Sequence, residues 1–478
     1  MPRSVTEPDT HRTIRPGAIL AVVLVSYFMI VLDNSIVFTG LARIRADLGF
    51  TTSGLSWVQN AYALVFGGLL LLGARAGDIL GRRRMFLLGL MIFALASLSI
   101  GLSPTAEWMI VSRAVQGVGS AILAPTSLAL LTANFAEGPA RTRAVAAYGS
   151  TAGIGASLGL VVGGVVADLT SWRVGFLINV PIGIVLAIAA LRFIGETPRV
   201  GGRFDVAGAI TSTVGMTALV YGVTRTADSG WDDPVALAAI GGGLVVLAGF
   251  ILIEWRAAQP ILPLRVFRNR VRGGAFIARM LFSGAIFGYF FFISQYLQGT
   301  LGLTPLLAGV AFLPMTVVQF GLSLIVPRLT RRLGNGTLVA AGLAITLAGM
   351  VWLSFVRADS SYWLAVALPM LLLGAGQGIG FAPLTAAGIA GIEPRDAGAA
   401  SGLVNVAHQL GGALGVSIMV SIATAGLAGT SATALAGEAS RGLVTGAALL
   451  AVALAAALLL VVRWTRVQRP VPEPVAAG

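Results

Sequence analysis

Fourteen apolar stretches, each long enough to cross a membrane, constrain the fold of this chain more than any other feature of the sequence. A membrane-spanning helix needs about 20 predominantly apolar residues. Such stretches lie near 17–40, 54–74, 84–103, 107–131, 143–167, 173–194, 205–225, 234–253, 273–298, 304–327, 336–356, 361–388, 397–424 and 441–463. Only 11% of the 478 residues are charged, whereas soluble chains carry about a quarter. The sequence therefore predicts an all-α polytopic membrane protein, and an even number of spans places both termini on the same side.

The arginines predict which side that is. All 32 basic residues are arginine, of which 24 lie in the two tails and the loops on the side of the termini and six lie in the opposite loops. Basic residues concentrate on the cytoplasmic side of membrane proteins. We therefore expect the protein to lie in the inner membrane, with both termini in the cytoplasm. Exclusive use of arginine is typical of a G+C-rich bacterial genome. The net charge of +13 then reflects loops that face anionic lipid, and nucleic acid is not an expected partner.

The residue types present argue against enzyme chemistry. The chain has no cysteine and two histidines, so disulfides and thiolate ligands are excluded and no metal-binding cluster or phosphate-binding loop is visible. We expect no cofactor, no metal and no enzymatic activity.

Loop lengths divide the chain into six, two and six spans. We expect a cytoplasmic tail at 1–16, a six-helix half at 17–194, a linker with two extra helices at 195–272, a second six-helix half at 273–463 and a tail at 464–478. A weak repeat supports this division, because GARAGDILGRRR at 73–84 and PRLTRRLGNG at 327–336 both join the second and third helices of a six-helix set. Two such halves are the plan of many transporters.

Two charges lie inside the apolar stretches of the first half. Asp33 lies about seven residues from the outer end of span one, roughly 10 Å deep, and Arg113 lies at a similar depth in span four. Buried charges in a membrane are costly, so they pair or face a cavity. Desolvation favours the neutral form of a carboxylate and a neighbouring cation favours its charged form. We expect Asp33 to be a proton switch; a structural ion pair and direct contact with a substrate are the alternatives.

Two glycine-rich segments are candidates for conformational gating. The loop GARAGDILGRRR supplies Gly73, Asp78, Gly81, Arg82 and Arg83, and we expect Asp78 to stand before the N-terminus of span three, where the helix dipole favours an anion. The alternative is an ordinary basic loop that caps a helix and has no gating role, because such a loop would have a similar sequence. In span five, small residues recur every four positions and predict a seam of close helix packing; they are Gly155, Gly159 and Gly163.

Polar and aromatic side chains within the spans are the candidates for substrate contact. Span nine contains four consecutive aromatic residues followed by a polar patch, which suits flat or cationic molecules, although lipid packing is an alternative. The expected substrate-binding residues are Asn34, Tyr62, Gln116, Gln295, Tyr296, Asn405 and Gln409. His408, near the middle of span thirteen, could titrate near neutral pH or make a structural hydrogen bond. Arg279, near the start of span nine, is expected to snorkel to the interface.

Five segments on successive spans resemble one known group of transporters. They are LDNSIV at 32–37, WVQNAYAL at 57–64, GARAGDILGRRR at 73–84, RAVQGVGSA at 113–121 and SWRVGFLINVPIG at 171–183. In this order they are similar to the signatures of the fourteen-span drug:proton antiporters of the major facilitator superfamily, over essentially the whole chain.

The resemblance implies a function that spacing alone does not give. A member of this family would export drugs or other amphipathic small molecules, cations among them, in exchange for protons by alternating access, as a monomer surrounded by membrane lipid. Asp33 and Arg113 would couple protons, His408 would be a second candidate, and Gly159, Gly163 and Gly164 would belong to the antiporter motif of helix five. This chain departs from the family in having Leu160 where proline is usual and His408 where arginine is frequent.

Two other functions remain open from the sequence. The chain could export one natural product only, or it could import a metabolite together with protons. A passive channel is disfavoured because nothing resembles a repeated selectivity filter.

Overall fold

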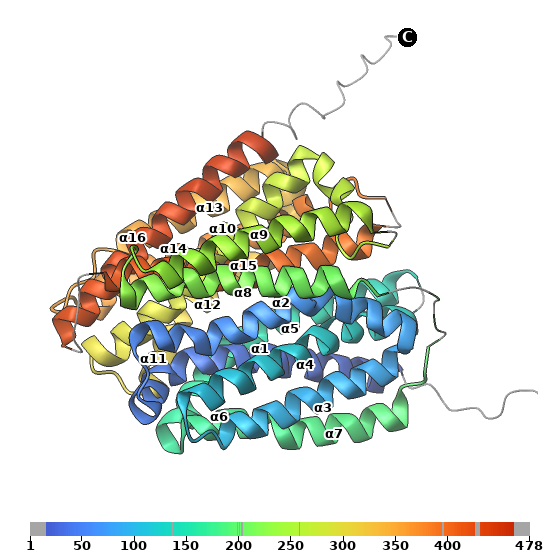
Figure 1. Cartoon of the computed structure of the whole chain (residues 1–478), viewed down its shortest axis with the longest axis horizontal. Coiled ribbons are helices and arrows are strands. Elements are labelled where there is room, and N and C mark those ends of the chain that lie inside the picture. Colours follow the sequence, from blue (N-terminus) through green and yellow to red (C-terminus); the bar gives the residue numbers. More distant parts are fainter. Residues whose placement is uncertain are drawn as a thin grey trace, which may run out of the picture.

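The structure, a computed structural model, describes residues 16–462 apart from 136, 198, 200, 202–203, 258, 394–395 and 426–430. Apart from Pro16, the two expected tails lie outside these residues. Within them, fourteen helical stretches are long and apolar enough to cross a membrane. This confirms the all-α polytopic fold, and Figure 1 shows the long helices lying side by side in one bundle.

The first six spans form one half of the bundle. The sixth span consists of two helices that meet at Ile178. The helices of this half are α1 (Pro16–Leu48), α2 (Thr52–Leu80), α3 (Arg82–Gly101), α4 (Ala106–Asn134), α5 (Pro139–Leu169), α6 (Trp172–Leu177) and α7 (Asn179–Phe193).

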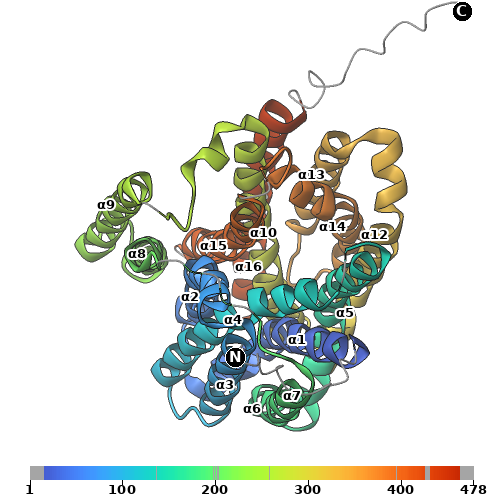
Figure 2. The same cartoon turned by 90° about the vertical axis from the view of Figure 1, so that its right-hand side faces the viewer.

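The last six spans form the other half, in which several spans include a short helical segment of a different pitch. The elements are η1 (Leu264–Arg268), α10 (Arg270–Gln295), η2 (Tyr296–Thr300), α11 (Pro305–Ala311), α12 (Leu313–Leu333), α13 (Asn335–Leu353), η3 (Trp363–Ala367), α14 (Leu368–Gly388), α15 (Ala397–Thr424), α16 (Ala432–Ala456) and η5 (Ala457–Val462). Seen along the helices, the two halves lie on opposite sides of the bundle (Figure 2).

Because the described spans cross fourteen times, α1 begins and η5 ends at the same end of the bundle. We call this end the terminal end and the opposite one the distal end. Loops after even-numbered spans lie at the terminal end, and loops after odd-numbered spans lie at the distal end.

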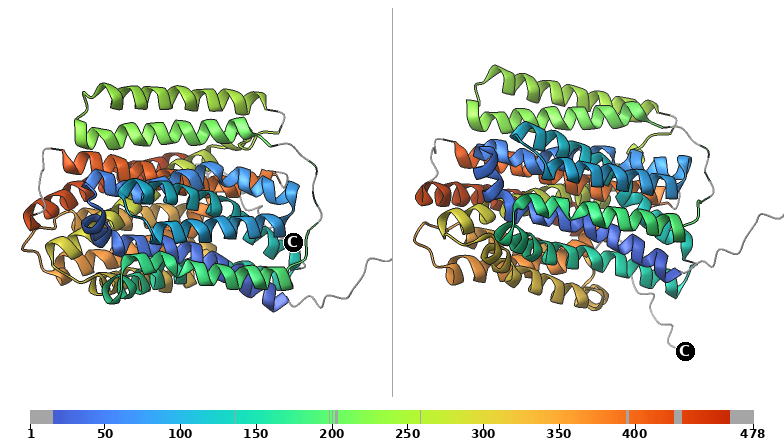
Figure 3. Two further views of the ribbon diagram at one scale, coloured as in Figure 1. Left: turned by 60° about the horizontal axis from the view of Figure 1, so that its bottom comes forward. Right: turned by 90° about the horizontal axis from the view of Figure 1, so that it is seen from below.

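The two extra helices, α8 (Val206–Ser229) and α9 (Pro234–Arg256), form a layer outside the bundle (Figure 3). They are joined at the distal end, where the Arg225 guanidinium donates to Asp233 at 2.5 Å and lowers the pKa of that carboxyl. α9 is largely exposed along its length, as expected of a helix that faces lipid.

α8 contacts both halves near the distal end. On the side of α2, the Ser53 hydroxyl donates to the Asp228 carboxylate at 2.6 Å. On the side of α15, the Thr224 hydroxyl donates to the Ser417 hydroxyl at 2.8 Å, and the same hydroxyl accepts from the Asn60 amide of α2 at 2.8 Å. The first extra helix therefore holds a buried polar junction between the halves.

Glycines let α5 pack closely on two neighbours. A Cβ atom on Gly159 would lie 2.5 Å from Cβ of Ser35, and one on Gly163 would lie 2.7 Å from Cα of Ile36, so both glycines press against α1. A Cβ atom on Gly164 would instead lie 2.5 Å from the carbonyl oxygen of Pro305 at the start of α11. The glycine run thus serves a contact within the first half and a contact between the halves.

We predict that Gly159→Ala lowers the thermal unfolding midpoint of the purified protein in detergent. The added methyl group overpacks the contact with α1, which typically costs about 1–3 kcal/mol. Gly149→Ala on the same helix is the matched control, because nothing lies within 4 Å of its Cβ position and alanine favours the helix by about 1 kcal/mol. An unchanged or raised midpoint for Gly159→Ala would show that α5 does not depend on this seam.

Candidate functional site

α1 carries Asp33 to the middle of the bundle. The helix continues through Leu48, and at 1.5 Å per residue Asp33 lies about 22 Å from its distal end. The helix therefore extends beyond the expected span 17–40. Arg43, Arg45 and Asp47 interrupt the apolar pattern, but they lie on the last turns of the same helix.

Asp33 and Arg113 form a fully buried ion pair. Nη1 of Arg113 on α4 donates to Oδ2 of Asp33 at 2.8 Å, and both side chains are 0% exposed. A buried pair is tolerated when its remaining polar atoms are hydrogen-bonded, and removing either partner leaves an uncompensated charge. The two charges that the sequence singles out are thus direct partners.

Two amide side chains complete the coordination of the carboxylate. Oδ1 of Asp33 accepts from Nε2 of Gln116 at 2.9 Å and from Nδ2 of Asn179 at 2.8 Å. Both amides also donate to the Ser97 hydroxyl, at 2.8 and 3.3 Å. Residues from α1, α3, α4 and α7 therefore converge on one carboxylate, in a site that excludes solvent.

Arg113 is held by further contacts. Its Nε donates to the backbone carbonyl of Val58 at 2.9 Å, and its Nη1 also donates to Oε1 of Gln116 at 2.5 Å. The guanidinium carbon lies 4.3 Å from the ring centroid of Tyr62 and 5.8 Å from that of Phe176. These rings supply cation–π attraction, which is worth about 2 kcal/mol when desolvated.

This arrangement fits the ionised form of Asp33. A carboxylate only accepts hydrogen bonds, whereas the protonated group has one donor and less acceptor capacity. All three neighbours of Asp33 donate to it, so a proton on either oxygen would displace a donor and remove the attraction to Arg113. The geometry therefore links the charge of Asp33 to the packing of four helices.

The expected substrate-binding residues are not brought together in one place. Tyr62 and Gln116 belong to the ion-pair network, and Asn34 accepts from the Gln59 amide at 3.2 Å nearby. Gln295 and Tyr296 lie at the distal end of α10, where Tyr296 donates to the backbone carbonyl of Arg357 at 2.8 Å.

The remaining two expected substrate residues lie on α15. Asn405 is exposed and Gln409 is buried. Gln409 packs beside Gly67 of α2, whose Cβ position would lie 3.0 Å from Cβ of Gln409.

The hydrogen bonds that join described residues of the two halves all lie in the distal part of the bundle. The Ser294 hydroxyl donates to the backbone carbonyl of Phe38, and Nε2 of Gln298 donates to that of Thr39 at 3.1 Å. Arg45 donates to Oε1 of Gln295 at 3.4 Å. Further toward α2 and α16, Thr52 donates to Glu438 at 3.5 Å and Asn60 donates to Ser417. The distal end is therefore sealed by polar contacts.

The basic loop between α2 and α3 is held in place by contacts with residues of the first half. Asp78 lies in the last turn of α2 and pairs with Arg82 at 2.9 Å, and Arg82 also donates to the backbone carbonyl of Ala129 at 3.3 Å. Gly81 has φ of +108°, which favours glycine. At Gly73 there is no room for a Cβ against the backbone of α4.

The expectation that Asp78 stands before the N-terminus of α3 was wrong, because α2 runs through Leu80. Glu196 has this role instead. Its carboxylate accepts from the backbone N–H groups of Arg83 at 3.1 Å and Arg84 at 3.2 Å.

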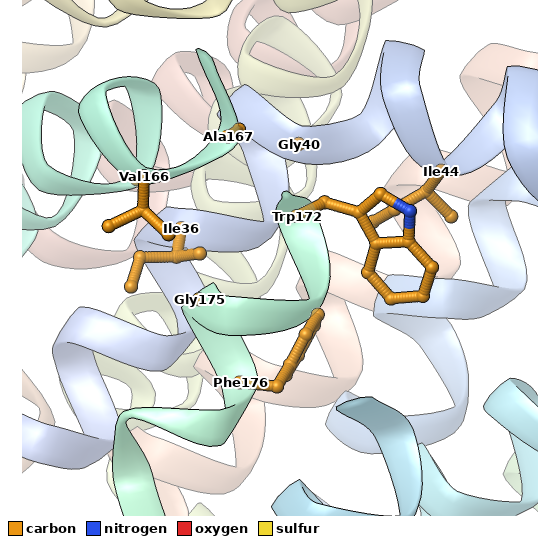
Figure 4. A pocket seen from close by; sticks show the side chains of 9 residues that line it. Ile36, Gly40, Ile44, Val166, Ala167, Trp172, Gly175 and Phe176 are labelled. Carbon is orange, nitrogen blue, oxygen red and sulfur yellow. The ribbon is translucent and has the colours of Figure 1, made fainter. Parts of the chain in front are cut away.

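A narrow crevice between α1, α5 and α6 has no polar lining. Figure 4 shows Ile36 and Ile44 of α1, Val166 of α5, and Trp172 and Phe176 of α6 around it. It does not admit a water molecule, so it has neither the space nor the polar groups of a substrate site.

Two polar residues of the second half, His408 and Arg279, lie against aromatic rings. His408 lies edge-on to Phe287 and Phe381, with ring centroids 5.2 and 5.9 Å apart, and its Nδ1 has no hydrogen-bond partner among the described residues. Arg279 is only 3% exposed. The expectation that it snorkels was wrong, because its side chain turns inward and lies over the Phe381 ring.

Sequence reasoning missed three residues of these networks: Ser97, Asn179 and Glu196. A signal existed for Asn179, because it is the one amide in the stretch SWRVGFLINVPIG and it directly follows the break at Ile178. Ser97 and Glu196 are ordinary residues of a span and a loop, and only the fold brings them to their partners.

The fourteen-helix bundle and its buried charge network define a multi-pass membrane transporter. Residues 23–416 match the family model described as Major Facilitator Superfamily. The chain belongs to this superfamily.

Two curated relatives are similar over most of their length. The chain is 39% identical to the cephamycin export protein CmcT of Amycolatopsis lactamdurans over 428 residues, which is 88% of each chain. It is 39% identical to the puromycin resistance protein pur8 of Streptomyces alboniger over 410 residues, 85% of this chain and 81% of that one.

A solved structure confirms the fold. A bacterial homologue of the human lysosomal transporter Spinster, in an inward-facing and unoccupied conformation, superposes with a TM-score of 0.71 at 14% identity, covering 96% of this chain and 99% of that one.

We predict that Arg113→Gln destabilises the folded protein by about 3–5 kcal/mol, because it leaves the Asp33 carboxylate buried without its cation. The double variant Asp33→Asn/Arg113→Gln should recover most of this loss, since no charge is then left unpaired. Denaturant unfolding in mixed micelles measures both. Equal destabilisation of the single and double variants would contradict a direct dependence of one charge on the other.

Proposed function

We propose that the protein is a proton-coupled antiporter that exports amphipathic small molecules across the inner membrane of a bacterium by alternating access. The observation that carries the proposal is the solvent-free contact between Asp33 and Arg113. If the Asp33 carboxyl is ionised when it is paired with Arg113 and protonated when the two are separated, it takes up and releases one proton per transport cycle.

The arginine bias assigns the terminal end, with both termini, to the cytoplasm. The distal seal then closes the outer side, so the structure corresponds to the stage at which a compound enters from the cytoplasm. Outward opening exposes Asp33 to the acidic side, where a proton binds and the compound leaves. Return to the present arrangement ionises Asp33 again as Arg113 approaches.

The proton gradient supplies enough free energy for this exchange. One pH unit is worth about 1.4 kcal/mol per proton, and 100 mV adds about 2.3 kcal/mol per charge. These values are comparable to the few kcal/mol that separate two conformations of such a protein.

The roles of other residues follow from their places in the structure. Gly73, Asp78, Gly81, Arg82 and Arg83 keep the α2–α3 loop compact at the cytoplasmic end. The α5 glycines allow α1, α5 and α11 to approach closely while the outer side is sealed. His408 is a second candidate for proton binding, and the protein acts as a monomer.

Export of a single natural product is the second candidate function. Two of the relatives are named for cephamycin export and puromycin resistance. A panel of unrelated compounds separates the two readings, because a dedicated exporter moves one compound and a multidrug exporter moves several. Reversing the imposed proton gradient distinguishes both from an importer.

We predict that puromycin or a cephamycin drives proton movement in proteoliposomes of the wild-type protein, and that Asp33→Asn abolishes this movement because the amide cannot take up a proton. The compound should still bind to Asp33→Asn, measured by equilibrium dialysis.

Asp232→Asn is the matched control, since Asp232 is exposed in the α8–α9 loop, and it should transport like the wild type. Proton flux that persists in Asp33→Asn would make the pair structural and direct attention to His408. Absence of flux with a broad compound panel would remove the export proposal itself.

A further inference from the structure

Unlike Arg113, Arg279 has no carboxylate partner among the described residues. It is buried on α10, and none of the ion pairs among the described residues includes it. The helices α10, α14 and α15 contain no aspartate or glutamate. α16 also packs on α10, but its Glu438 bonds to Thr52 at the distal end, whereas Arg279 lies nine residues from the terminal end of its helix.

The guanidinium is also short of hydrogen-bond acceptors. It has five N–H donors, yet the one hydrogen bond that it makes to a described residue runs from Nη1 to the Thr385 hydroxyl at a long 3.4 Å. Its Nε has no hydrogen-bond partner within the part of the chain that the structure describes. The carbon of the guanidinium lies 3.6 Å from the ring centroid of Phe381, which supplies attraction but no acceptor. Burial of an ion without a counter-charge is strongly unfavourable, so the site suits a ligand that provides one.

The same ring joins Arg279 to a second unsatisfied group. His408 on α15 lies edge-on to Phe381, and its Nδ1 has no partner among the described residues. Arg279 and His408, from two different helices, therefore both lie against the ring of Phe381.

Two residues of this region are exposed, in the parts of α14 and α15 nearer the terminal end. Phe381 is 38% exposed, and Asn405, three residues before His408 on the same helix, is also exposed. The hydrogen-bonded seal between the halves lies at the distal end. A compound that enters from the terminal end would meet Phe381 and Asn405 first and Arg279 behind them.

We propose that Arg279 is the docking point for a carboxylate, or an equivalent oxyanion, of the transported compound, with Phe381 packing against the apolar body of that compound. The inference rests on the proposed export function and names its substrate class as amphipathic anions, where the sequence suggested cations. A guanidinium binds a carboxylate through two parallel hydrogen bonds, and the unused donors of Arg279 are available for them. A cation at this position would meet repulsion from Arg279 instead.

The test compares aromatic carboxylates with their neutral amides, for example 2-naphthylacetate with 2-naphthylacetamide, in four pairs of increasing size. Binding is measured by equilibrium dialysis with the purified full chain in neutral detergent. We expect the wild type to bind the carboxylate of at least one pair tenfold or more tightly than the amide. Arg279→Gln should lose this preference and Arg279→Lys should keep part of it.

Arg331→Gln is the matched control, because Arg331 is exposed at the end of α12, and it should bind as the wild type does. No carboxylate preference in any pair, or a preference that survives in Arg279→Gln, overturns the proposal. A second arm uses nanodiscs of phosphatidylcholine with or without phosphatidylglycerol. Loss of the preference in the presence of the anionic lipid, with Arg279-dependent lipid binding, would assign the site to a lipid phosphate and also overturn it.

Failure of this inference is distinguishable from failure of export, because binding in detergent needs no gradient. Carboxylate preference without proton-linked transport would retain the anion site and remove the antiporter. Proton-linked transport without carboxylate preference would retain the antiporter and remove the anion site.

Discussion

The contact between Asp33 and Arg113 is the interaction on which the rest of this structure depends. A carboxylate in the middle of a bilayer is stable only when a cation and hydrogen-bond donors surround it. Here these come from α4 and α7, whose two amides also donate to Ser97 of α3. The charge state of one side chain therefore affects the packing of helix α1 against its neighbours. α1 also carries Phe38, Thr39 and Arg45, which join the second half at the distal end. The carboxylate and the distal seal are thus parts of the same helix.

The two halves use their buried arginines differently. Arg113 is neutralised by Asp33 and fully enclosed, whereas Arg279 has Phe381 and a single weak acceptor. In our account the first arginine responds to a proton and the second to the compound. The two charged centres lie on different halves, so a ligand on one and a proton on the other would both bias how the halves meet.

Much of this could be predicted from the sequence, because a membrane allows few solutions for an apolar chain. The fourteen spans follow from hydropathy, and Asp33 and Arg113 stand out because charges are rare in such stretches. The length of α1 was underestimated since Arg43, Arg45 and Asp47 ended the apolar pattern without ending the helix. Such errors arise because charged residues end the apolar pattern in the sequence, whereas the helix itself can continue past them.

Other features depend on which residues face each other, and a single sequence does not contain this information. Asn179 and Ser97 are unremarkable until α7 and α3 place them beside Asp33. Arg279 was expected to reach the interface, but the direction of a side chain around a helix is decided by packing against α14 and α15. The glycines of α5 predicted close packing, and the structure adds that Gly164 faces the other half.

The most direct test of the central claim is a distance measurement between spin labels at the distal ends of the two halves. The chain has no cysteine, so Ala46→Cys and Thr433→Cys, at exposed positions, place labels there without background. The account predicts that the distance lengthens in a larger fraction of molecules as the pH falls, and that Asp33→Asn shows the long distance even at neutral pH. A distribution that is the same at both pH values and in Asp33→Asn would contradict the claim that the charge of Asp33 holds the distal end closed.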